Sequence, residues 1–192
     1  AVDDARAREL RQQAAEQATA KERKRREAVR AVLDAARSGA LARSPGGVTN
    51  AVFGLVRYPH EETVSQLSEC VSQVTARLQE VRAEVESSAV GTLAVRQREE
   101  VGQGSLDAAR VCCEALGWIG RGEACVKVLG DYMDAEADVG RAAYAGEALC
   151  RIGGESALAL ARRALVRFNN EGLFTTRVGR ALRHSQYRSR CG

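Results

Sequence analysis

Apolar residues recur with a helical period along most of this chain. Between residues 60 and 87, valine and leucine follow one another at spacings of 3 and 4 without exception, which is the a/d pattern of a coiled-coil helix. The residues that keep this spacing are Val64, Leu67, Val71, Val74, Leu78, Val81 and Val85. A seam made mainly of valine is narrow, so we expect it to lie against one long partner helix. That partner is either residues 3–37 of this chain or a different protein.

The first 44 residues predict one long helix. Residues 3–37 contain no proline or glycine and are rich in alanine, arginine, glutamate and glutamine, which favour helix. Only the second half has an apolar stripe with a reason to pack, formed by Val29, Val32, Leu33 and Ala36. The sequence Ser-Pro-Gly-Gly at 44–47 then breaks the chain, and a short helix is expected over 48–58.

The sequence becomes self-similar after residue 105. The string Glu-Ala-Leu-Gly-Trp-Ile-Gly at 114–120 returns as Glu-Ala-Leu-Cys-Arg-Ile-Gly at 147–153, which is 33 residues later. Ala181-Leu182 begins a third, degraded copy after the same interval. Each complete copy predicts a helix, a tight turn at glycine and a second helix, and Ser105 is expected to be the N-cap of the first. Because such hairpins bury their apolar faces only against neighbours, we expect the heptad helix or a partner to cap this short array.

These two copies resemble the short HEAT-like repeats found in phycobilin lyases and in many scaffold proteins. The resemblance covers about residues 105–185, and it implies a short HEAT-like α-solenoid while indicating little about function. The sequence therefore predicts an all-α protein in three segments. They are a long basic helix over 1–44, a short helix plus the heptad-patterned helix over 45–104, and helical repeats with a basic tail over 105–192.

Composition agrees with this fold class and narrows the setting. The 192 residues are 45% hydrophobic but only 4% aromatic, with two prolines, a balance that favours alanine- and leucine-packed helices. No apolar run reaches the roughly 20 residues that span a bilayer, so no membrane span is expected. The six cysteines show no metal-ligand spacing, so we expect reduced, metal-free thiols that pack as small apolar residues. Such thiols indicate a reducing intracellular compartment, the interior of a mitochondrion or another organelle included.

The net charge of +4 is unevenly distributed, with basic ends and an acidic middle. Two basic clusters are therefore candidate sites for a polyanion. The first cluster is Lys21, Arg23, Lys24, Arg25 and Arg26, and the second is Arg180, Arg183 and Arg188. The alternative interpretation is a solvated helix face for the first cluster and a solvated terminus for the second.

No pattern of catalytic residues is found in the sequence. His60 and His184 lie in different predicted elements, and neither has a Ser, Cys or carboxylate partner at a spacing typical of a catalytic site. We expect no cofactor or metal, and we expect the Cys112-Cys113 pair to be buried. Trp118 is expected to be a packing residue, as is Tyr144.

We therefore expect a non-enzymatic scaffold subunit of a larger intracellular assembly. Its predicted contacts with other protein subunits are the apolar residues Val29, Val32, Leu33, Val64, Leu67, Val71, Val74 and Leu78. The alternative is an RNA-binding protein of an organellar ribonucleoprotein that uses the basic ends. A lyase-like enzyme is a third reading, and it is disfavoured because no site chemistry can be assigned to it.

Overall fold

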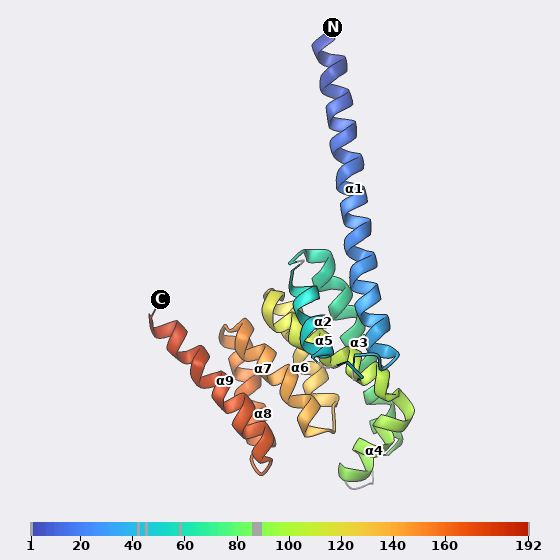
Figure 1. The fold of residues 1–192 in the computed structure, drawn as a ribbon. Helices are drawn as coiled ribbons and strands as arrows, with labels where there is room; N and C mark the ends of the chain where they lie inside the picture. Colours follow the sequence, from blue (N-terminus) through green and yellow to red (C-terminus); the bar gives the residue numbers. More distant parts are fainter. Residues whose placement is uncertain (1, 42, 45, 58, 86–89, 192) are drawn as a thin grey trace.

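The computed structural model describes residues 2–41, 43–44, 46–57, 59–85 and 90–191, without the side chains of 2–5, 90–91 and 186–191. All regular structure in these ranges is α-helical, which confirms the predicted all-α class (Figure 1). The helices are α1 (Val2–Arg37), α2 (Gly47–Val56), α3 (Glu61–Glu84), α4 (Val90–Val101), α5 (Gln103–Ile119), α6 (Gly122–Ala135), α7 (Val139–Ile152), α8 (Glu155–Arg167) and α9 (Gly172–Cys191). None of the helices in these ranges is both long and apolar enough to cross a membrane.

The helix boundaries largely follow the sequence signals. The long α1 covers the stretch that lacks proline and glycine. The backbone N–H of Glu62, in the first turn of α3, donates to Nδ1 of the N-cap His60 at 3.3 Å. In contrast, α5 begins at Gln103 after Gly102, so the N-cap predicted at Ser105 is wrong. Gly102 has a φ of 84°, and because glycine adopts such values without strain, the chain turns there rather than at the serine.

The repeat copies stack on one another. In one layer α5 packs on α7 and α7 packs on α9, while in the other layer α6 packs on α8. The turns between paired helices use glycines with positive φ, Gly122 at 77° and Gly153 at 74°. Close packing of α5 on α7 depends on Gly117, where a Cβ atom would lie 2.8 Å from the Cα atom of Ala148.

Helix α3 closes one end of this stack. It packs along both α5 and α6, and it also contacts α4 and α1. Its buried face is wider than an a/d seam because Thr63, Cys70 and Thr75 are buried beside the heptad residues. The expectation of one long partner helix is therefore wrong, since two shorter helices share the face. The heptad helix was expected to lie against the repeat-like helices, and α3 does contact α5 and α6.

The eight apolar residues expected to bind another subunit belong to the core of this chain. Val29, Leu33, Leu67, Val71, Val74 and Leu78 are buried, and Val32 and Val64 are half-buried against the same cluster. Their assignment to a protein partner is wrong because helices of the same chain cover them. The cluster continues from Val29 to Leu182 across both predicted segment boundaries, so the three segments share one core.

A buried glutamine fixes the turn between α6 and α7. The Nε2 atom of Gln97, in α4, donates to the carbonyl oxygens of Leu78 at 3.2 Å and Ala135 at 2.9 Å. Its Oε1 atom accepts from the backbone N–H of Ala137 at 2.9 Å. Because buried polar groups are costly unless they are hydrogen-bonded, these three bonds tie α3, α4 and the turn together.

Candidate functional site

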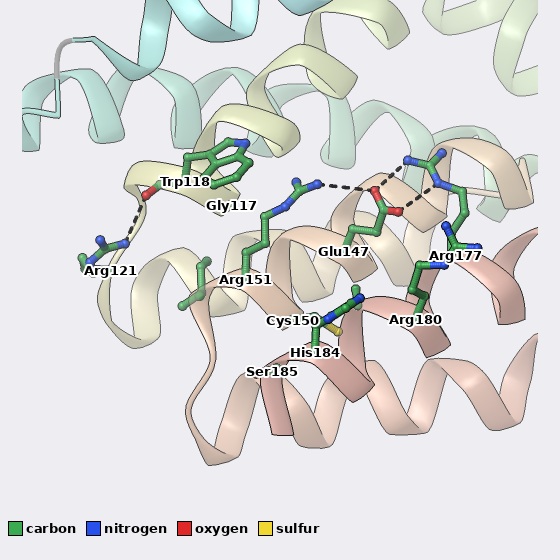
Figure 2. Close-up of a pocket in the computed structure, with 12 residues that line it drawn as sticks. Gly117, Trp118, Arg121, Glu147, Cys150, Arg151, Arg177, Arg180, His184 and Ser185 are labelled. Atoms are coloured by element: carbon green, nitrogen blue, oxygen red, sulfur yellow. Dashed lines mark hydrogen bonds and ion pairs between the residues drawn. The ribbon is translucent and has the colours of Figure 1, made fainter. Parts of the chain in front are cut away.

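A cavity of about 740 Å³ opens along the first helix of each repeat copy, between α5, α7 and α9 (Figure 2). We call it the α5–α7–α9 groove. Four arginines and one glutamate line it, so its charge is positive. The lining residues are Gly117, Trp118, Arg121, Glu147, Cys150, Arg151, Ile152, Arg177, Arg180, Ala181, His184 and Ser185.

The glutamate of the groove is neutralised within the chain. Glu147 accepts hydrogen bonds from Arg177, at 3.0 Å from Nε and 2.6 Å from Nη2, and Nη2 of Arg151 lies 3.9 Å away (Figure 2). Burial opposes the positive charge of Arg177, but hydrogen bonds to Glu147 and Tyr144 outweigh it and raise the pKa of the guanidinium. The positive charge of the remaining arginines is therefore not cancelled by the groove's own carboxylate.

Tyr144 of α7 supports the groove from one side. The guanidinium of Arg110 from α5 lies 4.1 Å from its ring centre, and that of Arg177 from α9 lies 4.0 Å from it. Cations at this distance are attracted by the ring, so three neighbouring helices are joined through one aromatic side chain. Tyr144 is half-buried and is a packing residue, as predicted.

Trp118 does not pack in the core, in contrast to the prediction. Its side chain is 52% exposed, and the guanidinium of Arg151 lies 5.0 Å from its ring centre. The tryptophan precedes the last residue of α5, where the helix end leaves its ring at the mouth of the groove (Figure 2). An exposed tryptophan beside arginines is the chemical feature of this surface that sequence reasoning missed.

The C-terminal basic cluster contributes to the groove only in part. Arg180 lines it, whereas Arg183 is exposed on α9 and is not among the lining residues. The side chain of Arg188 lies outside the described residues. Two further residues of the predicted basic tail, Arg177 and His184, also line the groove.

The basic cluster of α1 lies elsewhere. Arg26 pairs with Glu22 at 3.0 Å and also with Glu62 of α3, and Arg23 pairs with Glu27 at 3.8 Å. No ion pair is found in the described ranges for the other members of this cluster, Lys21, Lys24 and Arg25. Helices α1 and α9 lie at opposite ends of the molecule, so the two predicted basic clusters do not form one surface (Figure 1).

The thiol of the groove is not ionised near neutral pH. Burial raises the pKa of Cys150 to about 12, and its Sγ atom lies 3.9 Å from the carbonyl oxygen of Val178. Burial likewise raises the pKa of Cys113, which is fully buried next to Cys112 as predicted. The pKa of Cys70 is lowered to about 7, first by a hydrogen bond with Cys112 and then by Arg37, but this thiol is buried in α3 away from the groove.

Other buried charges serve the fold. Glu136 is fully buried and accepts hydrogen bonds from Nε and Nη2 of Arg141 at 2.9 and 3.1 Å. In the part of the chain that the structure describes, no group of three or more His, Cys, Asp and Glu residues is placed to hold a metal ion.

Comparisons with protein-family models, with curated proteins and with solved structures yield no match for this chain.

Proposed function

We propose that this protein is a non-enzymatic docking subunit that binds an acidic segment of another protein in the α5–α7–α9 groove. The observation that carries the proposal is the half-exposed Trp118 in a cavity where four arginines face one glutamate. Tryptophan and arginine are enriched among the residues that dominate protein–protein binding. Arginine also binds carboxylates through two parallel hydrogen bonds, which suits an acidic partner.

The chemistry of the groove supports binding rather than catalysis. Nucleophilic catalysis by cysteine needs a thiolate, and the raised pKa of Cys150 keeps its thiol protonated at neutral pH. The carboxylate of Glu147 is held by Arg177, so it is poorly placed to accept a proton from a substrate.

The distribution of charge favours a protein partner over RNA. The groove is short, and the second layer of the stack carries the carboxylates of Glu123, Asp131 and Asp134. A single-stranded nucleic acid is bound by an extended basic track along its backbone, and the carboxylates of the second layer interrupt such a track, whereas a short acidic segment fits within the groove. The basic cluster of α1 lies at the other end of the molecule and does not lengthen the track (Figure 1).

The stacking of α5, α7 and α9 supports the further proposal that about residues 105–185 form a short HEAT-like array. Stacked helical repeats commonly bind extended partners on the surface formed by successive equivalent helices. We propose that this subunit serves an intracellular assembly in a reducing compartment, which includes the interior of a mitochondrion or of another organelle. The reason is that five thiols are free and buried, those of Cys70, Cys112, Cys113, Cys125 and Cys150.

The test compares a short oligoglutamate with an oligouridylate of equal charge, each labelled with a fluorophore and titrated with the protein. We expect the oligoglutamate to bind more tightly, and we expect Arg151→Gln and Arg180→Gln each to weaken its binding by about tenfold. Arg163→Gln is the matched control because Arg163 is an exposed arginine of α8 outside the groove, paired with Asp134. Tighter binding of the oligouridylate, with the same sensitivity to Arg151→Gln, would show that RNA is the partner instead.

A further inference from the structure

Two cysteines from different helices meet where α3 packs on α5. The thiol of Cys112 in α5 donates a hydrogen bond to the sulfur of Cys70 in α3, and both residues belong to the buried core. The Nη2 atom of Arg37, the last residue of α1, lies 3.9 Å from the Sγ atom of Cys70. The Cys70 sulfur therefore interacts both with a second thiol and with a guanidinium.

A cavity of about 490 Å³ between α1 and α3 reaches this sulfur. Cys70 lines it together with three arginines and one glutamate, which are Arg26, Arg30, Arg37 and Glu69, so the cavity is positively charged. Only 4% of Cys70 is exposed, which hinders bulky reagents. A water molecule occupies about 30 Å³, so a small oxidant such as hydrogen peroxide fits the cavity and can reach the thiol.

The charged and titratable groups around Cys70 favour its thiolate. They come from three helices, with Arg37 on α1, Glu69 on α3 and Cys112 on α5. The hydrogen bond from Cys112, helped by Arg37, outweighs burial and the charge of Glu69, and it lowers the pKa of Cys70 to about 7. About half of this thiol is therefore ionised at neutral pH, and the thiolate is the reactive form of cysteine.

The other buried thiols keep their protons. The hydrogen bond to Cys70, together with burial, raises the pKa of Cys112 well above its ordinary value. Burial also raises the pKa of Cys125 to about 11 and that of Cys150 to about 12. We therefore expect Cys70 to react with an oxidant before these thiols do.

We infer that Cys70 and Cys112 form a peroxide-sensitive pair, in which Cys70 is oxidised first and Cys112 then closes a disulfide between α3 and α5. This role is independent of the α5–α7–α9 groove and of the function proposed for it. In a reducing compartment the disulfide is transient, as is usual for redox-sensing thiols, and the thiols of the resting protein are reduced.

The reaction consumes one hydrogen peroxide and releases two waters. In the first step the Cys70 thiolate attacks one peroxide oxygen, the O–O bond breaks, and the hydroxide that leaves takes up the proton that the Cys70 thiol had released. Cys70 is then a sulfenic acid. In the second step the Cys112 sulfur attacks Sγ of Cys70, the S–O bond breaks, and the leaving hydroxide takes the proton of the Cys112 thiol. The two thiols together lose two electrons, which reduce the peroxide.

The first experiment needs no variant. The reduced full chain is treated with one equivalent of hydrogen peroxide near pH 7, then alkylated in denaturant and mapped by mass spectrometry. We expect a pair of peptides linked by a disulfide from Cys70 to Cys112, which dithiothreitol separates. Cys125 and Cys150 are internal controls and should be recovered fully alkylated. Oxidation spread evenly over the buried thiols, or no disulfide at Cys70, would overturn the inference.

Two variants assign the role of the second thiol. Cys112→Ala should prevent the disulfide and leave a sulfenic acid at Cys70, which dimedone traps. Cys113→Ala is the matched control, since Cys113 is the next residue in α5 and is equally buried, and this variant should still form the disulfide. A disulfide that persists in Cys112→Ala and is lost in Cys113→Ala would overturn the pairing.

Arg37 acts through Cys70 and is therefore a positioning residue, which a pH profile can test. The rate of peroxide consumption should be half-maximal near pH 7 in the natural sequence. Arg37→Gln should raise this midpoint by about half a unit to one unit and slow the reaction at neutral pH about twofold to fivefold, whereas Arg37→Lys should retain most of the rate. Arg30→Gln is the control, since Arg30 lines the same cavity but pairs with Asp34, and it should leave the midpoint unchanged. A midpoint at or above the ordinary cysteine value of about 8.5 in the natural sequence would overturn the inference.

Discussion

Arg177 of α9 donates a hydrogen bond to each carboxylate oxygen of Glu147 of α7, at 3.0 Å from Nε and 2.6 Å from Nη2. Removing the carboxylate by Glu147→Gln should raise the affinity of the groove for oligoglutamate by about threefold to tenfold, because one negative charge is lost. Removing the guanidinium by Arg177→Met should have the opposite effect, because it leaves the carboxylate unpaired in the groove. Binding titrations of the two variants at low salt measure these changes. Changes of the same sign would contradict the placement of the ligand next to Glu147.

Substitution of Gln97 should destabilise the fold. Gln97→Leu removes the hydrogen bond that satisfies the buried backbone N–H of Ala137, and it removes one of the hydrogen bonds to each of the carbonyl oxygens of Leu78 and Ala135. Leaving a buried polar group unpaired costs about 1–3 kcal/mol, so we expect a loss of about that size in urea unfolding. Gln103→Leu is the control, since Gln103 is exposed and bonds only with Asp107 of its own helix. Equal stability of the two variants would contradict the role of Gln97.

Two glycine-to-alanine changes should have opposite effects. A methyl group at Gly117 would lie 2.8 Å from Cα of Ala148, so Gly117→Ala should force α5 and α7 apart and cost about 1–3 kcal/mol. The helical Gly179 has only the flexible end of Arg183 within reach, at 3.8 Å, so Gly179→Ala should stabilise by up to about 1 kcal/mol. Thermal unfolding separates the two, and a neutral Gly117→Ala would show that the helices can move apart without loss.

The buried thiol of Cys150 should make stability depend on alkaline pH. Its pKa is raised from 9.0 to about 12 by burial, so the stability it contributes is fully present below pH 9. Between pH 9 and 12 the unfolded chain loses this proton while the folded chain keeps it, so the free energy of unfolding falls as pH rises. Cys150→Ala should make this fall shallower, by at most about 1.4 kcal/mol per pH unit. Urea unfolding of both proteins at several pH values from about 8.5 to about 10.5 measures the slope of the free energy of unfolding against pH. Identical slopes would show that the Cys150 thiol is not protected by burial.

The exposed part of α1 should contribute little to stability. The buried residues of α1 begin at Val29, and Leu10 is 60% exposed. Deletion of residues 1–20 should therefore leave the melting temperature nearly unchanged, while Leu33→Ala should cost about 2–5 kcal/mol because it opens a cavity in the core. A large loss of stability on deletion would show that the arm packs against the body.

Local signals in the sequence predicted the elements well because they act over one or two helical turns. The lack of proline and glycine over 3–37 and the strict spacing after Pro59 were enough for α1 and α3. A heptad pattern defines the apolar face of a helix but not what lies opposite, so it could not show that α3 packs on α5 and α6. Likewise, nothing near Gln97 marks it as buried, since its partners Leu78 and Ala135 are 19 and 38 residues away.

Part of the groove could be predicted from the sequence. The interval of 33 residues was visible, and it aligns Trp118, Arg151 and His184 on equivalent positions of successive helices. The exposure of Trp118 was not readable, because the residue type alone does not show which side of a helix faces a neighbour. The pairing of Glu147 with Arg177 depends on the packing of α7 on α9 and could be seen only in the structure.

The first part of α1 forms an arm that extends beyond the helical core. With a rise of about 1.5 Å per residue, the stretch before Val29 is about 40 Å long and points away from the body (Figure 1). A component attached near the tip would be held at that distance from the helical stack, on the far side from the groove. The number of residues in this part of α1 therefore sets how far its tip lies from the helical stack.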